Sequence, residues 1–116
     1  MEVHRMHGST FHSYFSPSSG SRELCAWRLE VAPGTTGVPH RVSREEVLLL
    51  LDGELTATID GVAATLRAGE AAMVPAGSTF GIDNVSGRPA SAWVTTSVGL
   101  EATLDSGEVI RPPWTR

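Results

Sequence analysis

The chain contains no lysine, because all nine of its cationic side chains are arginine. This absence excludes reactions that form a Schiff base on a lysine amine. Cysteine is scarce too: Cys25 is alone, so the chain cannot form an internal disulfide, and its apolar neighbours favour a buried thiol. A long apolar run and a signal-peptide pattern are also missing. We therefore predict a cytoplasmic protein with no membrane partner.

The sequence also lacks any run of basic residues, and its formal charge is -4 at pH 7. A surface that follows nucleic-acid phosphates needs clustered cationic side chains, so nucleic acid is not expected as a partner. A length of 116 residues is enough for one domain with its own core. These features predict a single domain whose partner is a small-molecule ligand or substrate.

Glycine and proline divide the sequence into segments of about 5 to 8 residues that are rich in β-branched and aromatic types. Residues 25–31 and 54–59 alternate apolar and polar side chains, which is typical of strands with one buried face. The dipeptide Asp60-Gly61 follows the second segment and indicates a two-residue hairpin. No segment shows a capped helical period, so we expect a low helix content.

Many short strands joined by tight turns predict an all-β fold, a closed barrel or jelly roll that leaves few free strand edges. The run from Val47 to Leu51 is apolar at every position, so we expect it to be covered on both faces. A small barrel has a single interior, so the second cover is either the N-terminal segment or another subunit. On this basis we hypothesise a homodimer.

The two ends of the chain differ in composition from its centre. Residues 1–23 are polar and rich in histidine and serine, which predicts an N-terminal arm or a strand swapped into a neighbouring sheet. Residues 24–110 hold the expected barrel strands. Residues 111–116 form a tail in which two prolines prevent continued strand pairing and Trp114 provides an apolar anchor.

Two spaced sets of residues in the barrel segment resemble the two conserved motifs of the cupin superfamily. The residues that match the first motif are Gly34, His40, Val42, Glu46 and Gly53, and those that match the second are Gly69, Pro75, Gly77, Phe80 and Asn84. The chain thus resembles a small single-domain cupin of the conserved-barrel type. This resemblance implies a double-stranded β-helix, or jelly roll, with a pocket between its sheets and a frequent tendency to dimerise.

The metal-binding positions of these motifs are incomplete here. The resemblance implies two histidines and a glutamate in the first motif and a histidine in the second; His40 and Glu46 match, but Val42 and Phe80 replace the other two. Neither replacement can donate a lone pair, and a first-row metal normally needs three or more protein ligands. Strand parity directs all four side chains into the pocket. We therefore predict a degenerate metal site and no cofactor.

The first functional hypothesis is a metal-independent enzyme of the isomerase, cyclase or lyase type. An ionised Glu46 beside His40 would orient the imidazole and stabilise it when protonated, which suits proton transfer during isomerisation, cyclisation, elimination or dehydration. The remaining predicted pocket residues are Val42, Leu48, Leu50, Phe80 and Ile82, with Arg44 as a possible ligand for a substrate carboxylate at the mouth. The alternative for His40 and Glu46 is that they only satisfy each other inside the barrel.

Two other functions stay open on the sequence alone. In one, a histidine of the N-terminal arm completes a divalent metal site for Fe, Mn, Ni or Zn, giving a metal-dependent dioxygenase or isomerase. The candidate ligands are then His40 and Glu46 together with His4, His7 or His12. In the other, the pocket binds a small ligand without catalysis.

Overall fold

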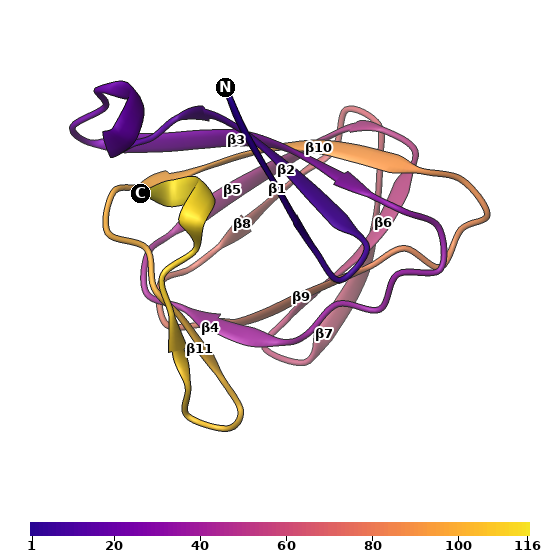
Figure 1. The fold of residues 1–116 in the computed structure, drawn as a ribbon. Coiled ribbons are helices and arrows are strands. Elements are labelled where there is room, and N and C mark those ends of the chain that lie inside the picture. The colour runs from indigo at the N-terminus through magenta and orange to yellow at the C-terminus, as the bar shows by residue number, and fades with distance from the viewer.

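The computed structural model describes all 116 residues as twelve strands in two six-stranded antiparallel sheets, with two short 3-10 helices and no α-helix (Figure 1). The first sheet contains, in spatial order, β1 (Glu2–Met6), β2 (Ser9–Phe15), β3 (Leu24–Val31), β10 (Ala90–Ser97), β5 (Glu46–Asp52) and β8 (Ala71–Val74). The second contains β12 (Val109–Ile110), β11 (Ala102–Leu104), β4 (His40–Val42), β9 (Thr79–Asp83), β6 (Glu54–Ile59) and β7 (Val62–Arg67). The all-β jelly-roll prediction is confirmed. Neither of the two short helices could span a membrane.

The inner faces of the two sheets form the hydrophobic core. In β3 the predicted inner row is confirmed, since Cys25, Trp27, Leu29 and Val31 are all buried and point to the same side, while Ala26 of the opposite parity is buried as well. A strand repeats every two residues, so this parity directs one row of side chains into the space between the sheets. The core and the pocket therefore belong to the same interior.

The hairpin predicted at Asp60-Gly61 joins β6 to β7 in register, with Ile59 opposite Val62. Both turn residues have positive φ, 49° at Asp60 and 81° at Gly61. This is the backbone of the two-residue turn that matches the right-handed twist of paired strands. An aspartate side chain tolerates the left-handed conformation, and it also accepts a hydrogen bond from the Thr79 amide at 2.9 Å.

Residues 1–23, expected as an arm or a swapped strand, add β1 and β2 to the chain's own first sheet. Strand β2 pairs along β3, with Phe11 opposite Leu29. The turn of this hairpin is His7-Gly8, and its tip is held where the Gly8 carbonyl accepts a hydrogen bond from the Ala32 amide at 3.0 Å. The hairpin thus extends across the space between the sheets in Figure 1.

The tail, residues 111–116, ends in the 3-10 helix η2 (Pro113–Thr115), which returns to the N-terminal strands. Its anchor is Trp114, which is only 8% exposed. The Trp114 carbonyl accepts a hydrogen bond from the Ser13 hydroxyl at 3.0 Å, and the Cys25 thiol donates to the Thr115 carbonyl at 3.5 Å. Both termini therefore close the same end of the sandwich.

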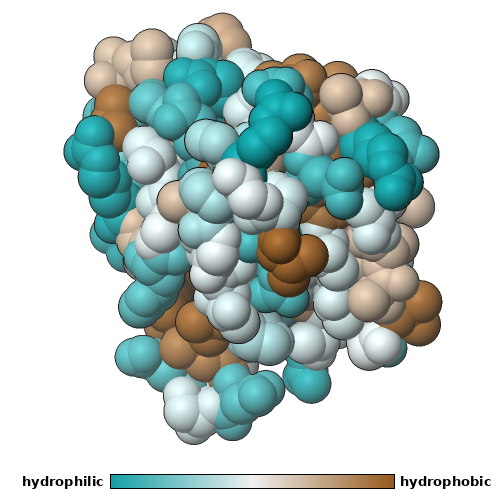
Figure 2. Space-filling model, turned by 90° about the vertical axis from the view of Figure 1, so that its right-hand side faces the viewer, coloured by the Kyte–Doolittle hydropathy of each residue, from teal (hydrophilic) through white to brown (hydrophobic).

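The prediction that the apolar run from Val47 to Leu51 is covered on both faces is wrong within one chain. Glu46, Leu48 and Leu50 face the core, whereas Val47, Leu49 and Leu51 lie on the outer face and are 45%, 36% and 44% exposed. The N-terminal hairpin adds to the far side of the same sheet, beyond β3, and so does not cover this outer face. Figure 2 shows a different side of the molecule, on which hydrophobic residues lie scattered among hydrophilic ones, as is normal for a protein surface.

Candidate functional site

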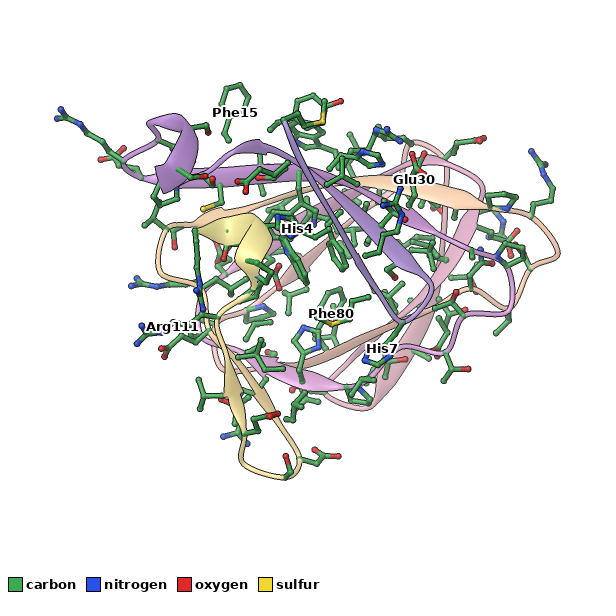
Figure 3. All side chains as sticks on the ribbon, in the orientation of Figure 1. His4, His7, Phe15, Glu30, Phe80 and Arg111 are labelled. Carbon is green, nitrogen blue, oxygen red and sulfur yellow. The ribbon has the colours of Figure 1, made fainter.

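One cavity of about 200 Å³ lies between the sheets, and 14 of its 20 lining residues are hydrophobic. Both sheets, the β1–β2 hairpin and the C-terminal tail contribute to its wall. Figure 3 shows His4, His7 and Phe80 directed into this interior, whereas Phe15, Glu30 and Arg111 point outward. The two chain ends, far apart in sequence, therefore complete one pocket.

Glu46 is the only acidic side chain in the pocket wall. It is the first residue of β5, is only 4% exposed, and points inward because it shares the parity of Leu48. Burial raises the pKa of Glu46 to about 7, and no neighbouring charge or hydrogen bond offsets this effect. Near neutral pH the carboxyl is thus present in comparable amounts of its acid and base forms.

His40 lines the pocket from β4, in the opposite sheet. Its Nδ1 lies 3.0 Å from the Val38 carbonyl oxygen, which can only accept, so Nδ1 carries the proton in the neutral ring. Phe80 is directly opposite His40 in the ladder and packs edge-on against the imidazole, with ring centroids 6.0 Å apart. The ring is therefore oriented, and its Nε2 is left as a hydrogen-bond acceptor.

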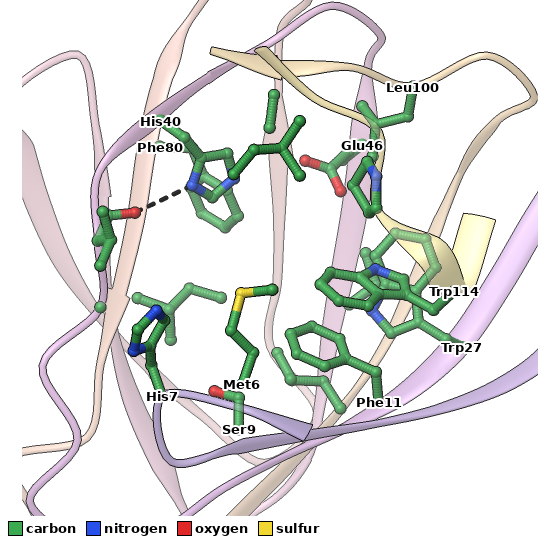
Figure 4. A pocket seen from close by; sticks show the side chains of 18 of the residues that line it. Met6, His7, Ser9, Phe11, Trp27, His40, Glu46, Phe80, Leu100 and Trp114 are labelled. Atoms are coloured by element: carbon green, nitrogen blue, oxygen red, sulfur yellow. Dashed lines mark hydrogen bonds between the residues drawn. The ribbon is translucent and has the colours of Figure 1, made fainter. Parts of the chain in front are cut away.

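The pair predicted between His40 and Glu46 is not formed, although both side chains face the same pocket. The chain crosses from the second sheet to the first between them, so they approach the cavity from opposite sheets. Figure 4 shows them at two ends: Glu46 lies beside Leu100 and Trp114, and His40 lies on the side of His7. The pocket thus has two separate polar positions with apolar surface between them.

The structure brings only some of the predicted pocket residues to the cavity. Leu48, Phe80 and Ile82 line it together with His40 and Glu46. Val42 and Leu50 are fully buried in the core behind the wall. Arg44 belongs to the exposed crossing between the sheets, where its guanidinium lies beside Gly99, so it is not placed to hold a substrate carboxylate in the pocket.

Three aromatic wall residues were missed by the sequence analysis: Phe11, Trp27 and Trp114. Phe11 and Trp114 are stacked, with ring centroids 3.5 Å apart and an interplanar angle of 8°. Trp27 lies edge-on to Trp114 at 6.5 Å. The inward parity of Trp27 was a usable signal, but the positions of the other two depend on where the chain ends return.

The N-terminal histidines do not assemble with His40 and Glu46. His7, at the hairpin tip, reaches the pocket wall. His4 faces inward but packs against Trp114, with centroids 6.3 Å apart. His12 lies on the outer face of the sheet, where its Nε2 is 3.2 Å from a Glu30 carboxylate oxygen.

The donors present do not fit the metal that the cupin resemblance implies. No three histidine, cysteine, aspartate or glutamate side chains lie close enough together to hold an ion. At the two replaced positions, Val42 is buried in the core and Phe80 places a ring against His40. The side chains present therefore do not form the donor set that such a metal needs.

Comparisons with known proteins agree with this fold. One similar solved structure is an RmlC-like cupin from Shewanella frigidimarina, 23% identical, with a TM-score of 0.71 over 83% of this chain and 82% of that one. Another is the polyketide cyclase RemF from Streptomyces resistomycificus, 21% identical, with a TM-score of 0.72 over 78% and 65% of the two chains. A third is a sugar phosphate isomerase of the cupin superfamily from Silicibacter pomeroyi, 17% identical, with a TM-score of 0.71 over 93% and 79%.

No curated protein matches the sequence. The sequence model of the family described as the cupin domain matches residues 27–97, which include both motifs and every strand from β4 to β9. This match covers more than half of the chain, and the two antiparallel sheets around a central pocket agree with it. The chain belongs to the cupin family.

Proposed function

We propose that this protein is an enzyme that moves a proton on a small organic molecule without a metal, as in isomerisation, cyclisation, elimination or dehydration. The observation that carries the proposal is the carboxyl of Glu46, buried in an apolar pocket with no partner. A carboxyl with a pKa of about 7 is suited to both halves of a proton transfer at neutral pH. The same group removes a proton as a carboxylate and returns one as an acid.

In this proposal Glu46 itself acts as the base and then as the acid, and it is not a charge partner for His40. The ionised form of Glu46 takes a proton from a carbon or oxygen of the substrate and becomes neutral, which suits its apolar surroundings. Returning this proton to another atom of the substrate completes an isomerisation and restores the carboxylate. The cycle needs no oxidant or reductant.

We assign to His40 the role of orienting the substrate. Its Nδ1 proton is engaged by the Val38 carbonyl at 3.0 Å, so Nε2 presents a lone pair to the cavity. A hydroxyl or enol of the substrate that donates to Nε2 would fix the molecule relative to Glu46 at the other end. Besides Glu46, the titratable side chains of the pocket wall are His40 and His7, and only the His40 ring is held by a hydrogen bond, which makes it the candidate for a second proton transfer.

The fold comparisons support enzyme activity in general terms. One structural neighbour is described as a polyketide cyclase and another as a sugar phosphate isomerase. Both descriptions name rearrangements of small molecules, which is the reaction class proposed here. Because a fold does not determine a reaction, the proposal depends on the Glu46 site.

The proposal is tested with a substrate that reports base catalysis directly. A nitrobenzisoxazole opens to a coloured phenolate when a base removes its single reactive C–H proton, and it is small, uncharged and aromatic. We expect turnover that rises as pH increases through about 7, where Glu46 ionises. In Glu46→Gln the turnover should fall by about 100-fold or more, the usual contribution of a general base.

The adjacent glutamate provides the matched control. Glu45 lies on the exposed crossing between the sheets, so Glu45→Gln removes an identical carboxyl outside the pocket. Its turnover and pH profile should equal those of the unmodified protein. Equal turnover in Glu46→Gln and Glu45→Gln would contradict the proposal and leave the pocket as a binding site without catalysis.

A further inference from the structure

The pocket wall has an unusual distribution of charge for this chain. None of the nine arginines lines it, and eight of the nine are exposed on the outer surface. The titratable wall residues are only Glu46, His40 and His7. The pocket therefore offers no permanent cation to balance a carboxylate, phosphate or sulfate, and its one carboxyl, when ionised, would repel such an anion.

Aromatic side chains are concentrated in the same wall. Four of the seven aromatic residues of the chain line it. These four are Phe11, Trp27, Phe80 and Trp114. Flat aromatic walls favour a flat aromatic ligand, because offset and edge-on ring contacts add to the burial of apolar surface.

The polar positions define where a ligand's functional group lies. Figure 4 shows the His40 ring bonded to the Val38 carbonyl on one side, with its other nitrogen facing the cavity. That nitrogen, Nε2, accepts and does not donate while the ring is neutral. His7 lies on the same side of the cavity as His40, whereas Glu46 lies at the aromatic end beside Trp114. A ligand hydroxyl is the complementary group at His40.

We propose that the pocket selects an aromatic alcohol or phenol of one or two rings without an anionic group, with its ring between the aromatic side chains beside Glu46 and its hydroxyl donating to Nε2 of His40. This inference rests on the proposed function, because it names the compounds on which that same site would act. The cavity volume of about 200 Å³ sets the limit on size. It is smaller than the roughly 300–1,000 Å³ typical of sites for drug-sized ligands.

The test compares three naphthalene derivatives of similar size by calorimetric titration at pH 8. Naphthol is the uncharged donor, naphthyl methyl ether lacks the donated proton, and naphthoate is an anion. We expect naphthol to bind best. Loss of one hydrogen bond should weaken the ether by about fivefold, and the unbalanced charge should weaken naphthoate by about tenfold or more.

Two variants link this selectivity to the assigned residues. His40→Phe keeps a flat ring but removes the acceptor, so naphthol and its methyl ether should bind equally. His40→Gln replaces Nε2 with an amide and should restore part of the preference. Glu46→Gln removes the negative charge, so the discrimination against naphthoate should shrink.

The groups packed against Glu46 carry no negative charge that could weaken naphthoate binding in its place. Thr96 is its neighbour on β10, Val74 its neighbour on β8, and Cys25 lies in the same row on β3. Burial raises the pKa of the Cys25 thiol, so this group stays neutral. Across the cavity the titratable wall groups are His40 and His7, and His4 packs against Trp114 with ring centroids 6.3 Å apart.

The outcomes separate this inference from the proposed function. Binding of naphthol without turnover of the nitrobenzisoxazole supports the ligand class and contradicts the enzyme. If the nitrobenzisoxazole is turned over but naphthoate binds as tightly as naphthol, the ligand class is overturned and the proposed enzyme activity stands. Failure of naphthol to bind at millimolar concentration also overturns the ligand class.

Discussion

Phe11 and Trp114 lie face to face with their ring centroids 3.5 Å apart, joining the second strand of the chain to its last few residues. The stack closes one end of the pocket, and the Ser13 hydroxyl reinforces it by donating to the Trp114 carbonyl at 3.0 Å. The N-terminal hairpin and the C-terminal tail are thereby held as one wall. Removing either ring should affect both stability and the pocket.

The first prediction is that Trp114→Ala lowers the free energy of unfolding by about 3 kcal/mol or more, as expected for deletion of a buried tryptophan side chain. Urea denaturation measures this change. In a double-mutant cycle with Phe11→Leu, the coupling between the two rings should be about 1 kcal/mol. A Trp114→Ala protein within 0.5 kcal/mol of the unmodified one, roughly the range of ordinary surface substitutions, would contradict the structural role of the tail.

The second prediction concerns the pH dependence of stability. Burial raises the pKa of Glu46 from its ordinary value of 4.5 to about 7 in the folded state. Between these values the folded protein binds more protons than the unfolded chain, so this group makes stability fall as pH rises through that window. The cost is absent below about pH 4.5 and complete above about pH 7, where it reaches roughly 3 kcal/mol.

Glu46→Gln removes this cost, because a glutamine stays neutral at every pH. We expect the variant to be more stable than the unmodified protein at pH 8 by up to about 3 kcal/mol. At pH 4.5 the two should differ little, and Glu45→Gln should show no such trend. The measurement is urea denaturation at both pH values. A variant that is less stable at pH 8 would show that Glu46 is paired when ionised.

Several features of the fold could be predicted from the sequence because strands repeat every two residues. The alternation around Trp27 and Leu29 identified the buried face of β3, and the same rule directed Glu46 and Phe80 inward. The turn at Asp60-Gly61 was predictable for a local reason, since few dipeptides adopt positive φ twice in succession.

The limits of prediction arise where distant segments meet. Parity directs His40 and Glu46 inward but does not show that the chain changes sheets between them, which separates the predicted pair. The same parity predicted that Arg44 points inward, but Arg44 lies on the exposed segment where the chain crosses between the sheets. The aromatic end of the pocket was missed because Phe11 and Trp114 are 103 positions apart and meet only through tertiary structure.

The third prediction is that the protein forms a homodimer through the outer face of its first sheet. This face exposes Val47, Leu49 and Leu51 of β5 beside Met73 of β8, which is 56% exposed. Trp93 is opposite Leu49 in the ladder, so it continues the same face. Contiguous exposed apolar surface is a feature of interaction sites, and tryptophan and methionine are enriched there.

The charges on the same face favour a second copy as the partner. Arg28 and Glu30 form an ion pair there, one strand beyond Trp93. A two-fold axis brings a patch against its own copy, so neighbouring charges of opposite sign can pair across the interface with Arg28 facing Glu30. Sedimentation equilibrium at micromolar concentration should therefore give the mass of a dimer.

Leu49→Arg places a charge in the centre of this face and should shift the protein to monomers without changing its far-UV circular dichroism. Val62→Arg is the matched control, because Val62 is 72% exposed on β7 at the edge of the other sheet. It should leave the dimer intact, since an isolated exposed valine contributes little to association. If the unmodified protein is a monomer, the homodimer prediction is wrong. If Val62→Arg alone dissociates the dimer, the interface lies on the second sheet instead. The apolar outer residues of β5 would then have to be explained by a partner of another kind.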